Sequence, residues 1–232
     1  RFFDMPKLLT LLTPGTAAQR AEEPEPIRRR IAIAQDEAFH FYYAANLDHL
    51  RRSGIDLVEF SPLRDAALPA GIEGLIFGGG FPECFVDALA QNGSLRAEVR
   101  SAIRGGLPCY AECGGLMYLA EELITSDARR CPMAGVVPGA VEMTPRLVNF
   151  GYCKTSLVNE EHSPVFHGHE FHHSRWLAEN ESANLWRVAK KRGGAARREG
   201  FGRARLHASY VHLHFATAGS VVDHLFEARS AA

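Results

Sequence analysis

The chain has 232 residues, of which 46% are hydrophobic, and its net charge is −1. This length can bury one large core or two small ones, and the near-neutral charge gives no electrostatic reason to bind nucleic acid or a membrane surface. We find no apolar stretch that could span a bilayer and expect no secretory leader, so the prediction is a cytoplasmic protein. Five scattered cysteines without metal-ligand spacing indicate reduced thiols and no metal site.

The start of the chain differs in composition from the rest. Charged residues dominate 20–30, and the only apolar patch before them is 8–12. We therefore predict a linker or inter-domain segment over 1–30, one domain over 31–227 and a short tail over 228–232.

Hydrophobic runs and helical periodicity alternate through the first half of the chain. The predicted strands are 31–34, 55–60, 75–77 and 109–111. The predicted helices are 39–52, one or two over 86–104, and 116–123. In the first helix, Phe39, Tyr43, Leu47 and Leu50 are expected to share one face. This alternation predicts an α/β fold with a mostly parallel twisted sheet and helices on both faces.

The second half is richer in strand patterns. Strands are expected at 136–143, 146–157, 170–175 and 206–215, and the basic, glycine-rich stretch 190–202 is expected to form a hairpin loop.

Cys113 is the strongest candidate for chemistry. It lies between a predicted strand and a predicted helix, and Gly114 and Gly115 follow it. A tight strand-to-helix turn pushes a side chain out of the sheet, and the helix N-terminus lowers a thiol pKa. Most cysteines are small buried hydrophobes, and that interpretation suits the other four.

The run Gly78-Gly79-Gly80 follows the third strand and ends at the same predicted sheet edge as Cys113. It is either a plain strand-to-helix turn or a loop whose N–H groups face a developing oxyanion together with that of Gly114. It is not a phosphate loop, because no Gly-Lys-Ser/Thr follows.

The segment 209–215 supplies candidates for a base. Strand alternation would place Tyr210, His212 and His214 on one face, and we prefer His212 as the thiol base. A structural histidine is the plain alternative. A metal site with His207 is less well supported, because no carboxylate has ligand spacing.

A second histidine cluster covers 167–173. Glu170 and His172 alternate onto one side, as on a substrate-facing strand or on a polar strand face. Spacing alone assigns neither residue a role.

Six segments together resemble the C-terminal glutamine amidotransferase domain of the cobyrinic acid a,c-diamide synthase family. They are 34–47, 60–63, 77–83, 110–118, 168–172 and 208–215. The resemblance covers about 31–227 and implies the class I, triad-type amidotransferase fold. It also implies that Cys113 attacks glutamine, that His212 is the base, and that Gly114 with Gly79 or Gly80 holds the oxyanion.

The resemblance also implies partners. In the complete synthase an N-terminal domain uses ATP and magnesium to activate the a- and c-acetate carboxylates of a corrinoid acid, and ammonia from glutamine amidates them. This chain has no P-loop, so we expect it to need that domain in cis or in trans and to carry no cofactor itself.

One departure concerns the triad. Many triad-type amidotransferases carry His-x-Glu, whereas the residue two past His212 is His214. We therefore expect weak or partner-dependent glutaminase activity. Two alternatives stay open, namely the same chemistry serving hydrogenobyrinic acid or another tetrapyrrole acid, and a non-catalytic docking or ligand-binding module.

Overall fold

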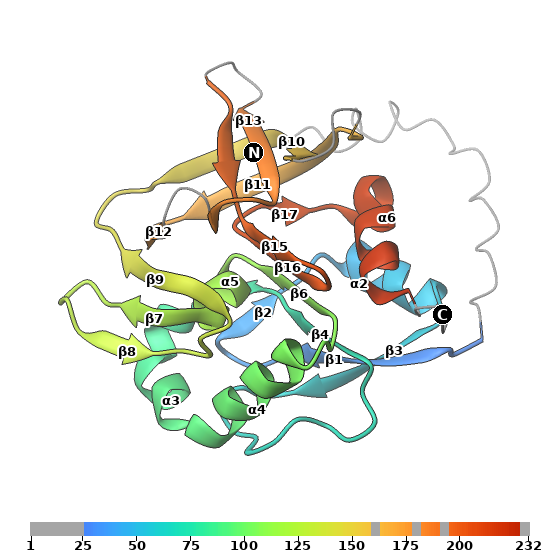
Figure 1. The fold of residues 1–232 in the computed structure, drawn as a ribbon, viewed down its shortest axis with the longest axis horizontal. Coiled ribbons are helices and arrows are strands. Elements are labelled where there is room, and N and C mark those ends of the chain that lie inside the picture. The colour runs from blue at the N-terminus through green and yellow to red at the C-terminus, as the bar shows by residue number, and fades with distance from the viewer. Residues whose placement is uncertain (1–25, 159–162, 178–181, 191–194, 228–232) are drawn as a thin grey trace, which may run out of the picture.

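A six-stranded sheet forms the centre of the computed structural model, which describes residues 26–158, 163–177, 182–190 and 195–227 (Figure 1). The strand order is β15–β16–β6–β4–β1–β3. The strands are β1 (Arg29–Ala34), β3 (Ile55–Phe60), β4 (Gly74–Phe77), β6 (Cys109–Glu112), β15 (Phe201–Arg203) and β16 (Leu206–Ser209). All neighbours pair in parallel except the edge strand β15. Of the predicted linker 1–30, residues 1–25 lie outside the described ranges, as does the whole tail 228–232.

Helices cover both faces of this sheet. They are α2 (Ala44–Arg52), α3 (Val86–Gln91), α4 (Gly93–Arg104), α5 (Gly114–Leu119) and α6 (Phe215–Phe226), with a 3₁₀ turn η1 (Pro82–Phe85) before α3. Because side chains alternate along a strand, Ala32 and Ala34 of β1 face a core shared with α3 and α4, whereas Ile31 and Ile33 face a core shared with α2 and α6. The predicted two-sided α/β architecture is confirmed.

The second half of the chain forms most of two smaller sheets, which are built mainly from antiparallel pairs. One has the order β14–β13–β10–β11–β17 and the other β12–β9–β7–β8, while β2 and β5 form a short ladder. Their strands are β2 (Phe39–Phe41), β5 (Gly79–Gly80), β7 (Ala120–Ile124), β8 (Arg130–Pro132), β9 (Val137–Met143), β10 (Asn149–Leu157), β11 (Phe166–His172), β12 (Ser174–Leu177), β13 (Trp186–Lys190), β14 (Arg197–Glu199) and β17 (His212–Leu213).

The helix predicted over 39–52 is wrong in its first turn. The Asp36 carboxylate accepts hydrogen bonds from the N–H groups of Ala38 and Phe39, at 2.9 and 3.1 Å, and the chain then pairs as β2 before α2 begins. Phe39 therefore packs in the core beneath α3 and α4, whereas Leu50 packs on the opposite side of the sheet.

The helix predicted over 116–123 begins two residues earlier, at Gly114, and ends early, at Leu119. The carbonyl groups of Tyr118, Leu119 and Ala120 accept hydrogen bonds from the N–H groups of residues 134–136. Because these carbonyl groups bond to residues 134–136 and not to a further helical turn, the chain continues as β7.

Changes of pairing partner along the chain explain the remaining differences between the predicted and the observed strands. The strand predicted over 170–175 passes from β11 into β12 of a different sheet, and that over 206–215 divides into β16, β17 and the start of α6. The predicted loop 190–202 contains β14 and part of β15. Alternation has the same period in every sheet, so it does not reveal where a chain changes pairing partner.

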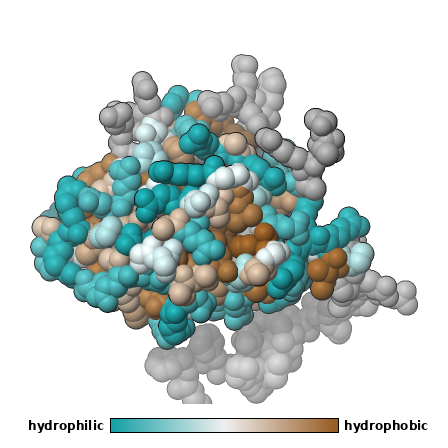
Figure 2. Space-filling model, turned by 60° about the horizontal axis from the view of Figure 1, so that its bottom comes forward, coloured by the Kyte–Doolittle hydropathy of each residue, from teal (hydrophilic) through white to brown (hydrophobic). Residues whose placement is uncertain are grey.

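The lower side of the molecule in Figure 1 has a mostly hydrophilic surface, interrupted by a group of hydrophobic residues (Figure 2). Within the described ranges, no helix combines the length and the apolarity needed to cross a bilayer.

Candidate active site

Cys113 occupies a strained turn between β6 and α5. Its backbone angles, φ 48° and ψ −101°, are unusual for a residue with a side chain. The turn is fixed on both sides, because the Cys113 N–H donates to the Ser209 carbonyl at 2.7 Å and its carbonyl accepts from the Met117 N–H at 3.1 Å. The thiol thus projects at the carboxyl end of the parallel sheet, as the strand–Cys–Gly–Gly–helix pattern predicts.

His212 lies beside Cys113 although 99 positions separate them in sequence. The chain leaves β16 after Ser209 and crosses to β17, which pairs with β11 and places His212 opposite His169. Burial lowers the pKa of His212, but hydrogen bonds and charge interactions with Cys113 and Glu112 outweigh burial and raise it to about 10. The raised pKa of His212 therefore favours a protonated imidazole beside the Cys113 sulfur.

A carboxylate completes this group. His212 Nδ1 is 3.3 Å from Glu112 Oε2, and both side chains are buried. Glu112 is the residue immediately before Cys113, whereas the His-x-Glu pattern looked for a carboxylate at 214. His214 is exposed, and its ring lies 5.9 Å from that of Tyr43.

The glycine loop approaches both catalytic candidates. A Cβ on Gly79 would lie 2.7 Å from His212 Cε1, and a Cβ on Gly114 would lie 3.1 Å from the Gly80 nitrogen. Gly80 has φ 159°, and a Cβ there would lie 2.0 Å from the Ala38 carbonyl oxygen, so only glycine fits. Gly114 begins α5, where first-turn N–H groups have no partner within the helix.

Tyr210, His212 and His214 do not share one face, contrary to the prediction. Tyr210 is buried, its ring stacks on that of His172 at 3.9 Å, and its hydroxyl is 2.9 Å from that of Ser174. His214 points outward because β16 ends at Ser209, so the expected continuous alternation is broken.

Glu170 and His172 do share a side of β11, as predicted, but that side is buried. Glu170 is 2% exposed and forms an ion pair with Arg197. His172 Nδ1 is 2.8 Å from the Ser174 carbonyl oxygen. Both residues are therefore part of the interior, where His172 stacks on Tyr210, and they do not lie on an open surface.

His207, which belonged to the weaker metal hypothesis, is also buried. The Trp186 Nε1–H donates to its Nε2 at 3.2 Å, and burial lowers its pKa to about 4. Among the residues that the structure describes, no group of three or more His, Cys, Asp or Glu side chains could hold a metal ion.

Aromatic side chains surround the mouth of the site. We call Phe41, Phe150, Tyr152 and Phe171 the aromatic rim; their exposed fractions run from 47% to 73%. The Phe41 ring lies 5.3 Å from that of His212, and the Phe171 carbonyl oxygen is 4.0 Å from Cys113 Sγ. Phe150 stands opposite Phe171 in the β10–β11 ladder.

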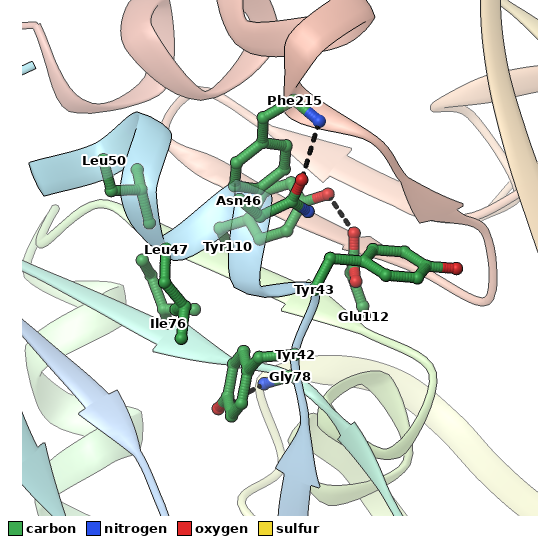
Figure 3. Close-up of a pocket in the computed structure, with 10 residues that line it drawn as sticks. All are labelled: Tyr42, Tyr43, Asn46, Leu47, Leu50, Ile76, Gly78, Tyr110, Glu112 and Phe215. Carbon is green, nitrogen blue, oxygen red and sulfur yellow. Dashed lines mark hydrogen bonds between the residues drawn. The ribbon is translucent and has the colours of Figure 1, made fainter. Parts of the chain in front are cut away.

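Sequence reasoning missed two residues that hold the site together. Glu112 lies between the predicted strand 109–111 and Cys113, where no pattern marked it. Asn46 of α2 is buried, and its Nδ2 donates to the Leu213 carbonyl at 2.9 Å. Its Oδ1 accepts from the Phe215 N–H, also at 2.9 Å (Figure 3). No local pattern signals such contacts across 167 and 169 positions of sequence.

A second buried carboxylate, Glu199, gives a stability prediction. Burial raises its pKa to about 7, although the Ser209 hydroxyl and the Tyr210 N–H donate to it. A folded-state pKa above the unfolded value means that stability falls as pH rises, here between about 4.5 and 7, by up to about 3 kcal/mol. Glu199→Gln should remove this loss.

Urea unfolding at pH 5 and pH 8 measures this pH-dependent loss of stability. The stability of Glu199→Gln relative to the natural chain should rise by up to about 3 kcal/mol between the two. An equal difference at both pH values would show that Glu199 is ionised without penalty.

A profile of the CobB/CobQ-like glutamine amidotransferase domain matches residues 30–219. The chain belongs to this family. The match begins within a residue of β1 and includes the β17 segment that carries His212, so the whole site described above lies inside the domain.

Similar proteins include cobyrinate a,c-diamide synthases. The one from Synechococcus sp. is 45% identical over 191 residues, which cover 80% of this chain and 41% of the relative. The one from Syntrophotalea carbinolica is 41% identical over 230 residues, which cover 94% and 50%. The amidotransferase chain thus spans about half the length of these curated relatives.

Solved structures confirm the fold. A crystal structure described as a glutamine amidotransferase superposes with a TM-score of 0.60 at 19% identity, covering 84% of this chain and 98% of that one. PurLQS from Thermotoga maritima gives 0.56 at 14% identity, covering 81% and 88%. At these identities the likeness concerns the class I amidotransferase fold alone.

Proposed function

We propose that this domain hydrolyses glutamine as the ammonia-supplying half of a cobyrinate a,c-diamide synthase. The observation that carries the proposal is the buried contact between His212 and Cys113 at the turn after β6, next to the glycine loop. The names of the relatives supply the acceptor, a corrinoid acid whose a- and c-acetate groups become amides.

The reaction begins with the Cys113 thiolate and the His212 imidazolium. Sγ attacks the side-chain carboxamide carbon of glutamine, and the new oxyanion accepts hydrogen bonds from the N–H groups of Gly114 and of Gly79 or Gly80. As the intermediate collapses, the C–N bond breaks and His212 gives its proton to the departing ammonia.

Water then releases the product. His212 takes a proton from the water, the hydroxide attacks the thioester carbon, and the C–S bond breaks. Glutamate leaves and the Cys113 thiolate is regenerated beside protonated His212. No metal or cofactor takes part in these steps. We place ATP and magnesium in the part of the full-length synthase outside this chain, because the sequence here contains no Gly-x4-Gly-Lys-Ser/Thr motif.

The experiment is an assay of the full-length synthase with cobyrinic acid, glutamine, ATP and magnesium. Glutamate release and corrinoid amidation should both occur, and a glutamine-analogue alkylator should label Cys113. Equal turnover of hydrogenobyrinic acid would remove the preference for the cobalt-containing ring. Glutamate release that stays absent with the ATP-binding half present would contradict the proposal and favour a binding module.

The aromatic rim supports a docking role for the surface around the site. Exposed aromatic residues that lie together are typical of interfaces, and the synthase half must receive ammonia without losing it to solvent. We predict that Phe150→Ser with Tyr152→Ser lowers corrinoid amidation about tenfold but lowers glutamate release less than twofold.

The measurement is the ratio of glutamate formed to amide formed. Val165→Ser is the matched control, since Val165 is 58% exposed next to β11, at the end of the hairpin far from the rim. An unchanged ratio in the double variant would show that the synthase half docks elsewhere.

A further inference from the structure

We infer that Glu112 is the residue that positions His212. It takes the place of the carboxylate of the His-x-Glu pattern, which this chain lacks at position 214. The inference rests on the proposed glutaminase reaction. Its basis is a buried contact of 3.3 Å between Glu112 Oε2 and His212 Nδ1, with side chains 8% and 5% exposed.

This contact fixes the orientation of the imidazole. A carboxylate acceptor at Nδ1 holds the proton on that nitrogen and leaves Nε2 to exchange a proton with the thiol. It also favours the charged ring, because Glu112 is an anion at close range. Both effects are what a third triad member contributes.

Glu112 is itself held in place. Its Oε1 accepts a hydrogen bond from the Leu213 N–H at 2.9 Å. It accepts another from the Tyr110 hydroxyl (Figure 3). One carboxylate therefore contacts both the His212 ring and the backbone of the next residue in β17. Asn46 binds the same strand from the other side, through the Leu213 carbonyl.

The strained Cys113 turn explains how adjacent residues can both reach His212. In a regular strand, neighbouring side chains point to opposite faces of the sheet. The positive φ at Cys113 breaks the strand directly after Glu112, so the thiol and the carboxylate approach one imidazole. The backbone strain thus serves the carboxylate as well as the nucleophile.

Few titratable groups surround this pair. Cys113 also contacts the His212 side chain, and His169 of β11 lies with its ring 6.3 Å away. Tyr43 and Tyr110 lie near Glu112, and His207 stacks on Tyr110. Glu112 is therefore the anion that stabilises a positive His212 once the thiolate has been consumed.

The test compares Glu112→Gln with Glu112→Asp. Gln keeps the volume but removes the charge, and we expect kcat/KM for glutamine hydrolysis to fall about 100-fold or more. Asp should restore part of it. Glu199→Gln is the matched control, because Glu199 is equally buried but bonds to Ser209 and Tyr210 and not to His212.

A second measurement separates positioning from folding. The rate of Cys113 alkylation by iodoacetamide reports the thiolate, and losing the anion beside His212 weakens the thiolate–imidazolium pair. In Glu112→Gln the midpoint of the alkylation–pH profile should move up by about one pH unit, and in Glu112→Asp it should move less. Thermal unfolding of each variant checks that the fold is intact.

The outcomes distinguish the two proposals. Alkylation needs no glutamine, so a shifted midpoint in a chain that hydrolyses none would sustain the Glu112 assignment and refute the proposed function. A folded Glu112→Gln variant with an unmoved midpoint would overturn the assignment, whatever its activity.

Discussion

Replacing Cys113 with alanine should abolish glutamate release from glutamine, with a loss of about 10⁴-fold or more in kcat. The reason is that every covalent step of the proposed reaction passes through its sulfur, and no other thiol lies in the turn after β6. Glutaminase assays under saturating glutamine measure the loss. Folding should be unaffected, because the turn is held by backbone hydrogen bonds to Ser209 and Met117.

Two controls accompany this variant. Cys84→Ala, at the exposed cysteine, should keep full activity. Full-length synthase carrying Cys113→Ala should still amidate the corrinoid when ammonium salt replaces glutamine, because the acceptor half is untouched. Retained glutamine-dependent turnover would remove Cys113 from the mechanism.

Gly79→Ala should lower kcat about 100-fold while the protein stays folded. The added Cβ would lie 2.7 Å from His212 Cε1 and 3.3 Å from Phe41 Cβ. At 2.7 Å the imidazole must shift from its position beside Cys113, and a displacement of about 1 Å costs roughly this factor. Steady-state kinetics with glutamine measure the change.

Gly93→Ala is the matched control for this variant. The nearest atom to a Cβ there is a flexible Arg96 nitrogen at 3.8 Å, so neither activity nor stability should fall. Thermal unfolding of Gly79→Ala should show a loss of only about 1 kcal/mol. A variant that melts like the natural chain and keeps its kcat would show that His212 tolerates the displacement.

The central sheet could be predicted from the sequence because its strands are local patterns. The runs 31–34, 55–60, 75–77 and 109–111 each appear in the structure within a residue or two. The turn at Cys113 could be predicted for the same reason, since the strand, the cysteine and the two glycines are contiguous. Burial on both faces makes such strands continuously apolar, and that signal needs no knowledge of the partners.

The second half was harder to predict, because its strands change partners without changing their pattern. The strand over 206–215 looked continuous, which placed His214 beside His212. In the structure the chain leaves the central sheet at Ser209, and the pairing of β17 with β11 exposes His214.

The sequence by itself determined the two-sided α/β layout and predicted Cys113 as the nucleophile and His212 as the base, because these rest on strand and helix patterns and on short contiguous motifs. Only the tertiary structure decided which carboxylate contacts His212. Glu112 and His212 meet across 100 positions, through a strained turn and strand pairings that no local pattern encodes. The carboxylate that contacts His212 is not near it in sequence. The crossover from β16 to β17 brings His212 next to Glu112, at the end of β6.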